Sequence, residues 1–448
     1  MLDCQEKLDD PAKSEKPAKA QPKLIGFTKQ LEARQDAQRP DSIVARKMAV
    51  LIVIGLITYV GYAFIWRVCV PMIHQNAKRR GSRTQGIVLL VFFVILWLMF
   101  CWSYLVIITT PPGYVKDHVQ VSAEPRWNAQ EGRFDDNPGT SQSSLIAGPA
   151  YPTPARPEHA HLQNTHAPDL QAGPQSFAAG LPATLEGALG SIAPPSSAAT
   201  PEEKPARTGP QRKIPEHAVL SPPARYCYKC QRIKPYRAHH CRHCGQCVLG
   251  MDHHCPWIGQ CAGARNKKYF MNFLQWAAIF TTYTFLASLL AAVPPHRPAG
   301  ASHTADPQQF VLIGIAGFFM IFTVGMAGAH TRLQLFNITT IEEIGITRMR
   351  RRERAATTLE YGLCSFGKKA KLVDEWDHEW GRLDKEGNIW WMGSARANWE
   401  AIMGTSKLGW FLPIKPTNRP DGLSYPVNPR FTPDGRWQRR ADWPQQLQ

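Results

Sequence analysis

The sequence predicts a mainly α-helical integral membrane protein with four transmembrane helices and a cytosolic cysteine-rich domain between the second and third helices. Two observations carry this prediction. Apolar residues gather into four uncharged blocks of roughly 20 residues, the length a helix needs to cross about 30 Å of hydrocarbon. The second and third blocks flank a short segment with seven of the chain's eleven cysteines. The blocks are Met48–Trp66, Gly86–Ile108, Tyr269–Val293 and Phe310–Gly328.

Charge along the chain predicts the orientation of these helices. Residues 1–47 are polar and lack the apolar stretch and cleavage site of a signal peptide, so we place them in the cytosol. Four crossings then return the tail and the cysteine-rich segment to the same side. The positive-inside rule agrees, because Arg225–Lys268 carries nine Lys or Arg against one acidic residue, and Arg348–Arg354 follows the fourth block. One loop disagrees, since the predicted lumenal loop contains Lys78, Arg79, Arg80 and Arg83.

Overall charge limits the partners. A net charge of +17 favours anionic partners, which include nucleic acid, acidic lipid headgroups and phosphate-bearing cofactors. Membrane helices favour the last two, so we expect membrane lipids and no nucleic acid. A cytosolic position also disfavours disulfides and favours thiolate–metal chemistry for the clustered cysteines.

The polar segments differ in composition. About half of the 37 prolines lie in residues 111–224, with much Ala, Ser and Gly, so we expect a mostly disordered linker; partner docking is the alternative. The tail after the fourth helix holds eight of the fourteen tryptophans, which indicates packing at the membrane interface or in a small core. The expected segments are a cytosolic N-terminus (1–47), helices one and two (48–110), the linker (111–224), the cysteine-rich domain (225–268), helices three and four (269–330) and the cytosolic tail (331–448).

The spacing of cysteine and histidine in the central domain is typical of zinc sites. Three Cys-x2-Cys steps fall within 21 residues, and each lets one turn present two thiolates to a tetrahedral ion. Two zinc sites need eight donors, whereas seven cysteines and four histidines supply eleven. The donors are Cys227, Cys230, His239, His240, Cys241, Cys244, Cys247, His253, His254, Cys255 and Cys261.

Spacing alone leaves open which donors are surplus. Reactivity nominates Cys255, because Asp252 and His253 precede it and the surrounding residues are basic, which are conditions that favour a nucleophilic thiolate. The alternative is that Cys255 is another zinc ligand, in a finger that binds RNA or protein.

This segment closely resembles the cysteine-rich domain of the DHHC protein S-acyltransferases, or palmitoyltransferases. The similarity covers about Tyr226–Phe270 and includes Asp252-His253-His254-Cys255. Thr339-Thr340-Ile341-Glu342 resembles the Thr-Thr-x-Glu motif of the family, and Asn388–Pro413, with Asn398, resembles its C-terminal motif more loosely. Gly259-Gln260 stands where many members carry two asparagines. The long linker and tail resemble those of fungal members.

The resemblance implies two structural zinc ions and assigns the surplus donors. One ion is expected on Cys227, Cys230, His240 and Cys247, and the other on Cys241, Cys244, His254 and Cys261. Cys255 becomes the nucleophile, His253 the base and Asp252 the residue that orients the base, while His239 remains for packing. Thr339 or Thr340 is expected near Asp252, and Asn398 is expected to brace the tail.

The activity implied by the resemblance is transfer of a fatty acyl group, chiefly palmitoyl, from acyl-CoA to protein substrates with membrane-proximal cysteines. The acyl group would pass through a thioester on Cys255. An apolar cavity between the helices would hold the acyl chain at about 0.8 kcal/mol per buried CH₂. The CoA phosphates need cations, although a solvated basic face is the alternative reading of the same residues. The candidates are Arg237, Lys234, Arg265 and Lys267, with Arg225, Arg232, Arg242 and Lys268.

Two other functions fit parts of the sequence. A membrane-anchored zinc module that binds protein or RNA is one, and a transporter that uses Asn272 and Thr281–Thr284 is the other. Uncharged third and fourth blocks count against the transporter. We expect a multi-pass endomembrane protein of the endoplasmic reticulum, Golgi or vacuole, with both termini cytosolic. Asn337-Ile338-Thr339 is then a cytosolic, unmodified sequon.

Overall fold

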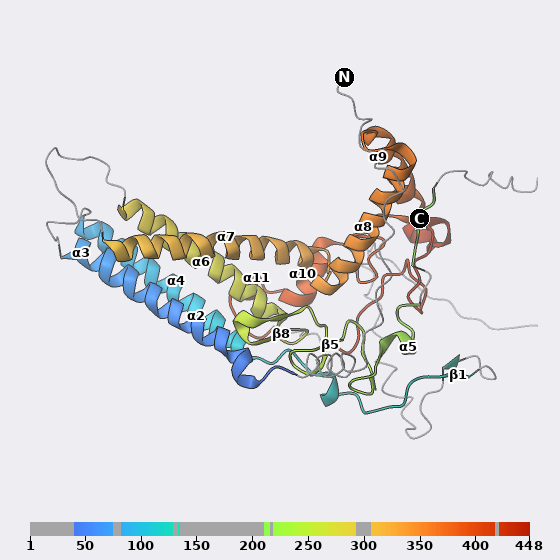
Figure 1. Ribbon diagram of the computed structural model, residues 1–448, viewed down its shortest axis with the longest axis horizontal. Helices are drawn as coiled ribbons and strands as arrows, with labels where there is room; N and C mark the ends of the chain where they lie inside the picture. Colours follow the sequence, from blue (N-terminus) through green and yellow to red (C-terminus); the bar gives the residue numbers. More distant parts are fainter. Residues whose placement is uncertain are drawn as a thin grey trace, which may run out of the picture. The chain divides into compact units, whose positions relative to one another are not determined.

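A computed structural model describes residues 40–74, 82–128, 133–134, 210–215, 218–292, 306–416 and 421–448. The four apolar blocks form four long helices, each long and apolar enough to cross a membrane (Figure 1). The first is α2 (Ile43–Phe64), which continues through a π-helical turn, η1 (Ile65–Cys69), into α3 (Val70–Ile73). The others are α4 (Arg83–Thr109), α6 (Lys267–Ala292) and α7 (Pro307–Leu335). Each predicted block lies inside its helix except for Val293, which falls outside the described residues.

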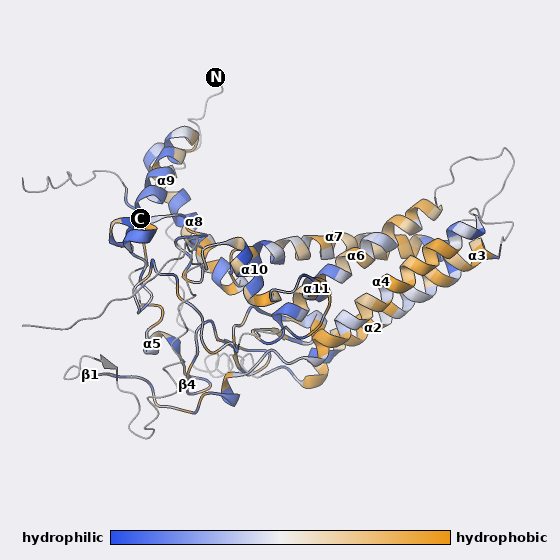
Figure 2. Ribbon diagram, turned by 180° about the vertical axis from the view of Figure 1, so that it is seen from behind, coloured by the Kyte–Doolittle hydropathy of each residue, from blue (hydrophilic) through white to orange (hydrophobic). Residues whose placement is uncertain are grey.

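Stacked aromatic side chains join α2, α4 and α6. Phe64 of α2 stacks on Phe93 of α4 with ring centroids 4.2 Å apart, and Phe100 of α4 stacks on Phe280 of α6 at 5.2 Å. Large apolar side chains elsewhere on these helices are exposed, including Leu51, Phe318 and Ile321. Figure 2 shows the same division, with apolar helices at one end and hydrophilic helices and loops at the other. A helix that is apolar all round suits a lipid environment.

The cysteine-rich segment folds into three short antiparallel hairpins. They are β3 (Tyr226–Cys227) with β4 (Arg232–Ile233), β5 (His239–Cys241) with β6 (Gln246–Val248), and β7 (His253–Cys255) with β8 (Gln260–Ala262). Gly245, with a φ of 68°, makes the tight turn between β5 and β6 in a left-handed conformation that suits glycine. Six two- or three-residue strands bury little apolar surface, so another interaction must hold their shape.

The described part of the tail contains four α-helices after α7. They are α8 (Thr340–Tyr361), α9 (Phe366–Trp380), α10 (Ala395–Met403) and α11 (Lys407–Phe411). Trp376, Trp390, Trp437 and Trp443 are buried, so core packing accounts for these four tryptophans. Near the membrane, α11 packs on α6, and Trp276 of α6 donates a hydrogen bond to the Phe411 carbonyl. Packing of the tail tryptophans at the membrane interface stays a prediction.

Short elements complete the described chain. They are η2 (Val115–Asp117), the strands β1 (Trp127–Asn128) and β2 (Arg133–Phe134), α5 (Pro222–Arg225), η3 (Pro256–Ile258), η4 (Arg440–Asp442) and η5 (Gln445–Leu447). Residues 1–39, most of the predicted linker and the basic residues Lys78, Arg79 and Arg80 lie outside the described residues.

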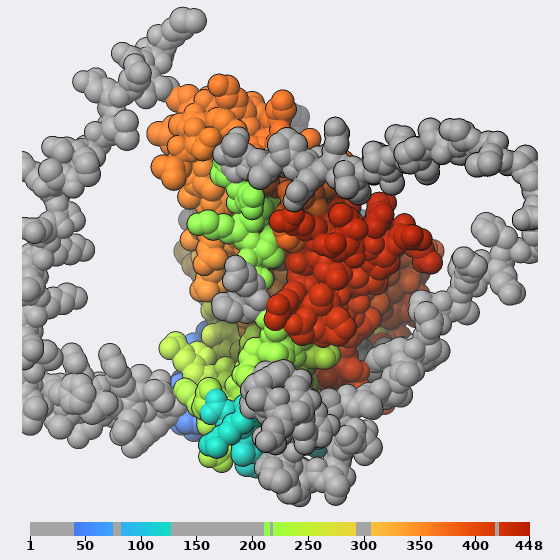
Figure 3. Space-filling view, turned by 90° about the vertical axis from the view of Figure 1, so that its right-hand side faces the viewer, coloured from blue at the N-terminus to red at the C-terminus, as the bar shows by residue number. Residues whose placement is uncertain are grey.

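One described piece of the linker is part of the tail. Residues 210–215 lie between α8, α9 and the C-terminal residues (Figure 3). The guanidinium of Arg212 is buried and lies 2.7 Å from Glu353 of α8 and 2.5 Å from Asp377 of α9. It also donates to the Gly381 carbonyl and lies 5.7 Å from the ring of Trp437. This clasp joins a segment that precedes the zinc domain to three parts of the tail.

Arg212→Met tests the clasp. Because the change removes the buried guanidinium from two half-buried carboxylates and a carbonyl, we expect a loss of about 2–3 kcal/mol in the stability of the tail. Thermal unfolding and limited proteolysis of the full-length protein in detergent measure it. The matched control is Arg396→Met on α10, where the exposed Arg396 pairs with Glu400. Loss of this surface ion pair should lower the stability of the tail by about 0.5 kcal/mol. Equal effects of the two changes would contradict a structural role for Arg212.

Candidate active site

The register of the hairpins brings the zinc donors together in two sets. His240 lies directly opposite Cys247 across β5 and β6, and His254 lies opposite Cys261 across β7 and β8. Each such pair meets a Cys-x2-Cys turn of the preceding hairpin. The resulting sets are Cys227, Cys230, His240 and Cys247, and Cys241, Cys244, His254 and Cys261. The hairpin of β5 and β6 thus contributes two donors to each set, which interlocks the three hairpins.

The donor distances fit tetrahedral zinc. In the first set, the sulfurs lie 3.3 to 3.9 Å from Nδ1 of His240, and in the second they lie 3.5 to 3.6 Å from Nδ1 of His254. Zinc with Zn–S of about 2.3 Å and Zn–N of about 2.05 Å places tetrahedral S and N atoms about 3.6 Å apart. Each set supplies four protein ligands, which is the composition of a structural site rather than a catalytic one.

Strand alternation separates Cys255 from these sets. Successive side chains of a strand point to opposite faces, so His253 and Cys255 lie on the face of β7 opposite to His254. Cys255 belongs to neither set of donors. Its side chain packs instead among Val50 of α2 and apolar residues of α4 and α6, with Tyr104 and Phe270 among them. The thiol therefore faces the membrane helices rather than the metal.

Asp252 holds His253 from a buried position. Its Oδ2 lies 2.7 Å from Nδ1 of His253, and its Oδ1 lies 3.1 Å from Nζ of Lys267 on α6. Thr340, the first residue of α8, donates its backbone N–H to the same Oδ1 at 3.2 Å, and its hydroxyl bonds to the Asp252 carbonyl. The other ring nitrogen of His253, Nε2, is buried and makes no hydrogen bond within the described part of the chain. That nitrogen is free to exchange a proton.

The same contacts shift two pKa values. Burial would raise the pKa of Asp252, but Lys267 and the hydrogen bond to His253 outweigh it and hold that pKa well below its usual range. Burial would lower the pKa of His253, yet Asp252 and the neighbouring Cys255 raise it to about 9. At neutral pH, His253 is therefore an imidazolium beside an ionised Asp252.

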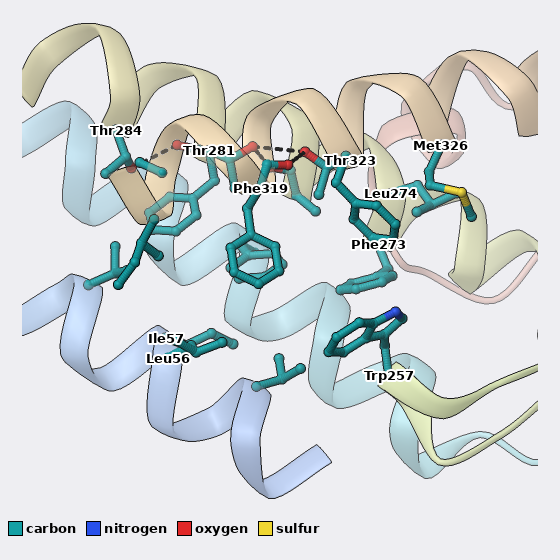
Figure 4. Close-up of a pocket in the computed structure, with 18 of the residues that line it drawn as sticks. Leu56, Ile57, Trp257, Phe273, Leu274, Thr281, Thr284, Phe319, Thr323 and Met326 are labelled. Carbon is teal, nitrogen blue, oxygen red and sulfur yellow. Dashed lines mark hydrogen bonds between the residues drawn. The ribbon is translucent and has the colours of Figure 1, made fainter. Parts of the chain in front are cut away.

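An apolar cavity opens beside the thiol. It runs between the helices from Cys255 and Trp257 to Thr284, lined by Ile57, Phe273 and Phe319 among others (Figure 4). The hydroxyls of Thr281, Thr284 and Thr323 donate to backbone carbonyls of their own helices, so they present no unsatisfied polar group. In Figure 4, Trp257 and Thr284 lie at opposite ends of the cavity. The cavity thus offers a long hydrophobic slot that begins at Cys255.

The Thr-Thr-x-Glu segment joins the zinc domain to the tail. Thr339 caps α8 in a capping box with Glu342. Both carboxylate oxygens of Glu342 accept from Arg237, at 2.9 and 2.7 Å, and Arg237 also stacks on Trp390 and Tyr425. Farther along the tail, buried Asn398 donates to the Leu335 carbonyl at the end of α7 and accepts from the N–H of Met392.

Several of the basic residues listed as candidates for the CoA phosphates have partners within the protein. Arg237 is neutralised by Glu342, and Lys267 by Asp252; both are buried, so neither remains a candidate for CoA phosphates. Lys268 is also buried, and its ammonium donates to the Ile414 carbonyl. Arg225 and Arg232 donate to backbone carbonyls, of Lys234 and Val119 among others. Lys234, Arg242 and Arg265 are less buried and stay candidates.

Three further residues lie at or near the site, and one of them, His330, was not singled out from the sequence. His330 of α7 is buried, 3.8 Å from Oδ2 of Asp252, with its ring 5.3 Å from that of His253. Gln260, read as neutral for chemistry, donates to the carbonyls of Ile107 and Thr110 and so fixes β8 to the end of α4. Asn337 of the sequon is buried, and its amide donates to the Trp390 carbonyl, which leaves no room for a glycan. A polar residue near the end of an apolar helix was the available signal for His330.

Fold and site together define a multi-pass membrane protein with a domain whose two Cys/His sets could hold metal ions and which presents Cys255, His253 and Asp252 at an apolar cavity. Residues 221–346 match the model of the DHHC palmitoyltransferase family. The chain therefore contains a DHHC palmitoyltransferase domain within these residues.

Named relatives share part of the chain. Palmitoyltransferase PFA3 of Debaryomyces hansenii is 33% identical over 196 residues, which cover 44% of this chain and 45% of that protein. Palmitoyltransferase PFA3 of Saccharomyces cerevisiae is 34% identical over 219 residues, 46% of this chain and 58% of that one. Palmitoyltransferase ZDHHC20 of Homo sapiens is 29% identical over 203 residues, 45% and 46% of the two chains. The chain spans about half the length of the curated relatives it matches.

Metal content tests the two donor sets. We expect two zinc ions per chain by mass spectrometry of the purified full-length protein, and Cys255→Ser should keep both, because Cys255 lies outside the sets. Cys244→Ser should lose its own ion and weaken the other site, since its hairpin contributes to both. A protein that loses zinc with Cys255→Ser would place that sulfur on the metal.

Proposed function

We propose that this protein is a protein S-acyltransferase, which transfers a fatty acyl group, palmitoyl in first place, from acyl-CoA to cysteines of protein substrates. One observation carries the proposal. Cys255 lies outside both metal-binding sets, follows His253 on the same strand face and opens onto an apolar cavity between membrane helices. A thiol in that position can reach a thioester whose acyl chain lies in the cavity.

The reaction needs two thioester exchanges. The thiolate of Cys255 attacks the acyl-CoA carbonyl, the bond from that carbon to the CoA sulfur breaks, and the CoA thiolate takes the proton of the His253 imidazolium. Neutral His253 then removes the proton of a substrate cysteine, whose thiolate attacks the acyl-Cys255 carbonyl. Cys255 leaves as a thiolate and His253 is again protonated, so the site returns to its first state. Asp252 holds the ring of His253 in orientation throughout.

The cavity supplies most of the binding energy for the acyl chain. Phe270, Leu274, Ala277, Thr281 and Thr284 follow one face of α6 along its wall. A helix rises about 1.5 Å per residue, so the interval from Phe270 to Thr284 spans about 21 Å. Each buried CH₂ contributes about 0.8 kcal/mol. A long saturated chain is thereby favoured over a short one.

Cofactors and location complete the proposal. Two zinc ions would brace the hairpins, and acyl-CoA would be the co-substrate, with Lys234, Arg242 and Arg265 as candidate contacts for its phosphates. The protein substrates would carry cysteines near the membrane, and membrane lipids would surround α2, α4, α6 and α7. We place both termini in the cytosol and the protein in an endomembrane, of the endoplasmic reticulum, Golgi or vacuole.

Labelling tests the nucleophile. We expect purified wild-type protein in detergent to acquire a hydroxylamine-sensitive label from a palmitoyl-CoA analogue, and Cys255→Ser to acquire none while its zinc content is unchanged. His253→Ala should slow labelling about 10²- to 10⁴-fold, the usual contribution of a general acid–base residue. Label that persists in Cys255→Ser would move the reaction to another sulfur. Absence of label in the wild type would reject the acyltransferase itself.

Thr284 tests the cavity. Thr284→Phe fills the end far from Trp257, so we expect long-chain acyl-CoA to lose rate while shorter chains are used as well as before (Figure 4). Competition between acyl-CoA of different chain lengths, read by mass spectrometry of the acylated Cys255 peptide, measures the preference. The control is Leu290→Phe, a change at an exposed position six residues farther along α6 and outside the cavity lining. An unchanged preference in Thr284→Phe would place the acyl chain elsewhere.

A further inference from the structure

Lys267 is a buried cation, and its ionic partner within the described part of the chain is the carboxylate of Asp252. It is the first residue of α6, and its side chain is 7% exposed, against 1% for that of Asp252. A buried ammonium is tolerated when a counter-ion and hydrogen bonds compensate its lost hydration. The burial of Lys267 beside Asp252 therefore suggests that its ammonium has a function in the site.

The two oxygens of Asp252 have different partners. Oδ1 accepts from Nζ of Lys267 at 3.1 Å and from the backbone N–H of Thr340 at 3.2 Å, whereas Oδ2 faces Nδ1 of His253 at 2.7 Å. The terminal torsion of an aspartate is broad and close to two-fold, so it does not select one orientation by itself. The two donors on Oδ1 select one orientation of the Asp252 carboxylate, and they thereby fix where Oδ2 lies.

The orientation of Oδ2 in turn decides the state of His253. An acceptor at Nδ1 places a proton there and leaves Nε2 as the nitrogen that exchanges protons. The face of the ring is held as well, because Phe270 meets it edge-on at 5.1 Å. Lys267, Phe270 and Leu274 recur at helical spacing, so one face of α6 touches Asp252, His253 and the cavity in succession.

We propose that Lys267 is a positioning residue for acyl transfer: its ammonium holds Oδ1 of Asp252 and thereby keeps His253 directed at the reacting sulfur. The inference rests on the proposed acyltransferase function and adds a residue to it. It also replaces the role in CoA binding that the sequence suggested for Lys267. Because α6 carries both Lys267 and the wall of the cavity, the acyl chain and the base are positioned by the same helix.

Kinetics of the full-length protein separate this role from phosphate binding. Lys267→Met should lower kcat for labelling by palmitoyl-CoA about 10- to 100-fold, the range expected when a reacting group is misplaced by about 1 Å. The KM for palmitoyl-CoA should stay within about two-fold, since the ammonium does not touch the co-substrate. Lys267→Arg should restore most of the rate. The matched control is Lys268→Met, which removes the next lysine of α6, whose ammonium donates to the Ile414 carbonyl.

These measurements distinguish failure of the Lys267 proposal from failure of the proposed acyltransferase function. A raised KM with unchanged kcat would return Lys267 to the CoA phosphates, and an unchanged rate would remove it from the site; either overturns the proposal. A loss in Lys268→Met equal to that in Lys267→Met would show general destabilisation and overturn it too. Absence of label in the wild type would instead reject the acyltransferase function.

A second comparison covers the case in which Lys267→Met does not fold because Asp252 is left unpaired. Asp252→Asn and the double variant Asp252→Asn with Lys267→Met both lack the buried carboxylate. If Lys267 acts through Asp252, the two variants label at the same rate, because the second change removes nothing further. A further fall in the double variant would show that Lys267 acts independently of Asp252, and the proposal would be wrong.

Discussion

The buried carboxylate of Asp252 is the contact on which the arrangement of the site depends. Its partners come from four elements, since His253 lies on β7, Lys267 on α6, His330 on α7 and Thr340 at the start of α8. A carboxylate taken out of water costs several kcal/mol unless its oxygens are paired. Asp252 can therefore be buried favourably only when the zinc hairpins, two membrane helices and the first turn of the tail have assembled around it. The same assembly brings Cys255 to the cavity.

A second buried pair extends this arrangement to the tail. Arg237 and Glu342 are separated by 105 residues, yet they form a two-pronged ion pair that also touches Asn337 and two aromatic rings. Glu342 belongs to the capping box that starts α8, so the pair fixes the direction in which the tail leaves the membrane. Two sequence motifs that look unrelated, one in the zinc domain and one after the fourth helix, are the two halves of one contact.

The features that the sequence predicted, the membrane helices and the metal-donor sets, depend on residues close together in the chain. Uncharged length alone identifies a membrane helix, so the four blocks lie in the four long helices, and donor spacing alone indicates zinc. The roles of Lys267, Arg237 and Arg212 depended on partners 15, 105 and 165 residues away, and composition cannot distinguish a solvated lysine from a buried one. His330 was missed for a related reason: α7 continues to Leu335, beyond the apolar block at which the predicted span ended. Register, too, was needed to see that His254 and Cys255 face opposite ways.

The opposite faces of β7 give the domain two kinds of sulfur chemistry that do not interfere. The six sulfurs of the two candidate metal-binding sets lie where the hairpins meet, and the sulfur of Cys255 lies at the membrane cavity. An electrophilic lipid that enters from the bilayer meets Cys255 before any metal-bound thiolate. A molecule of this shape attached to Cys255 would leave both Cys/His sets, the hairpins and the membrane helices as they are.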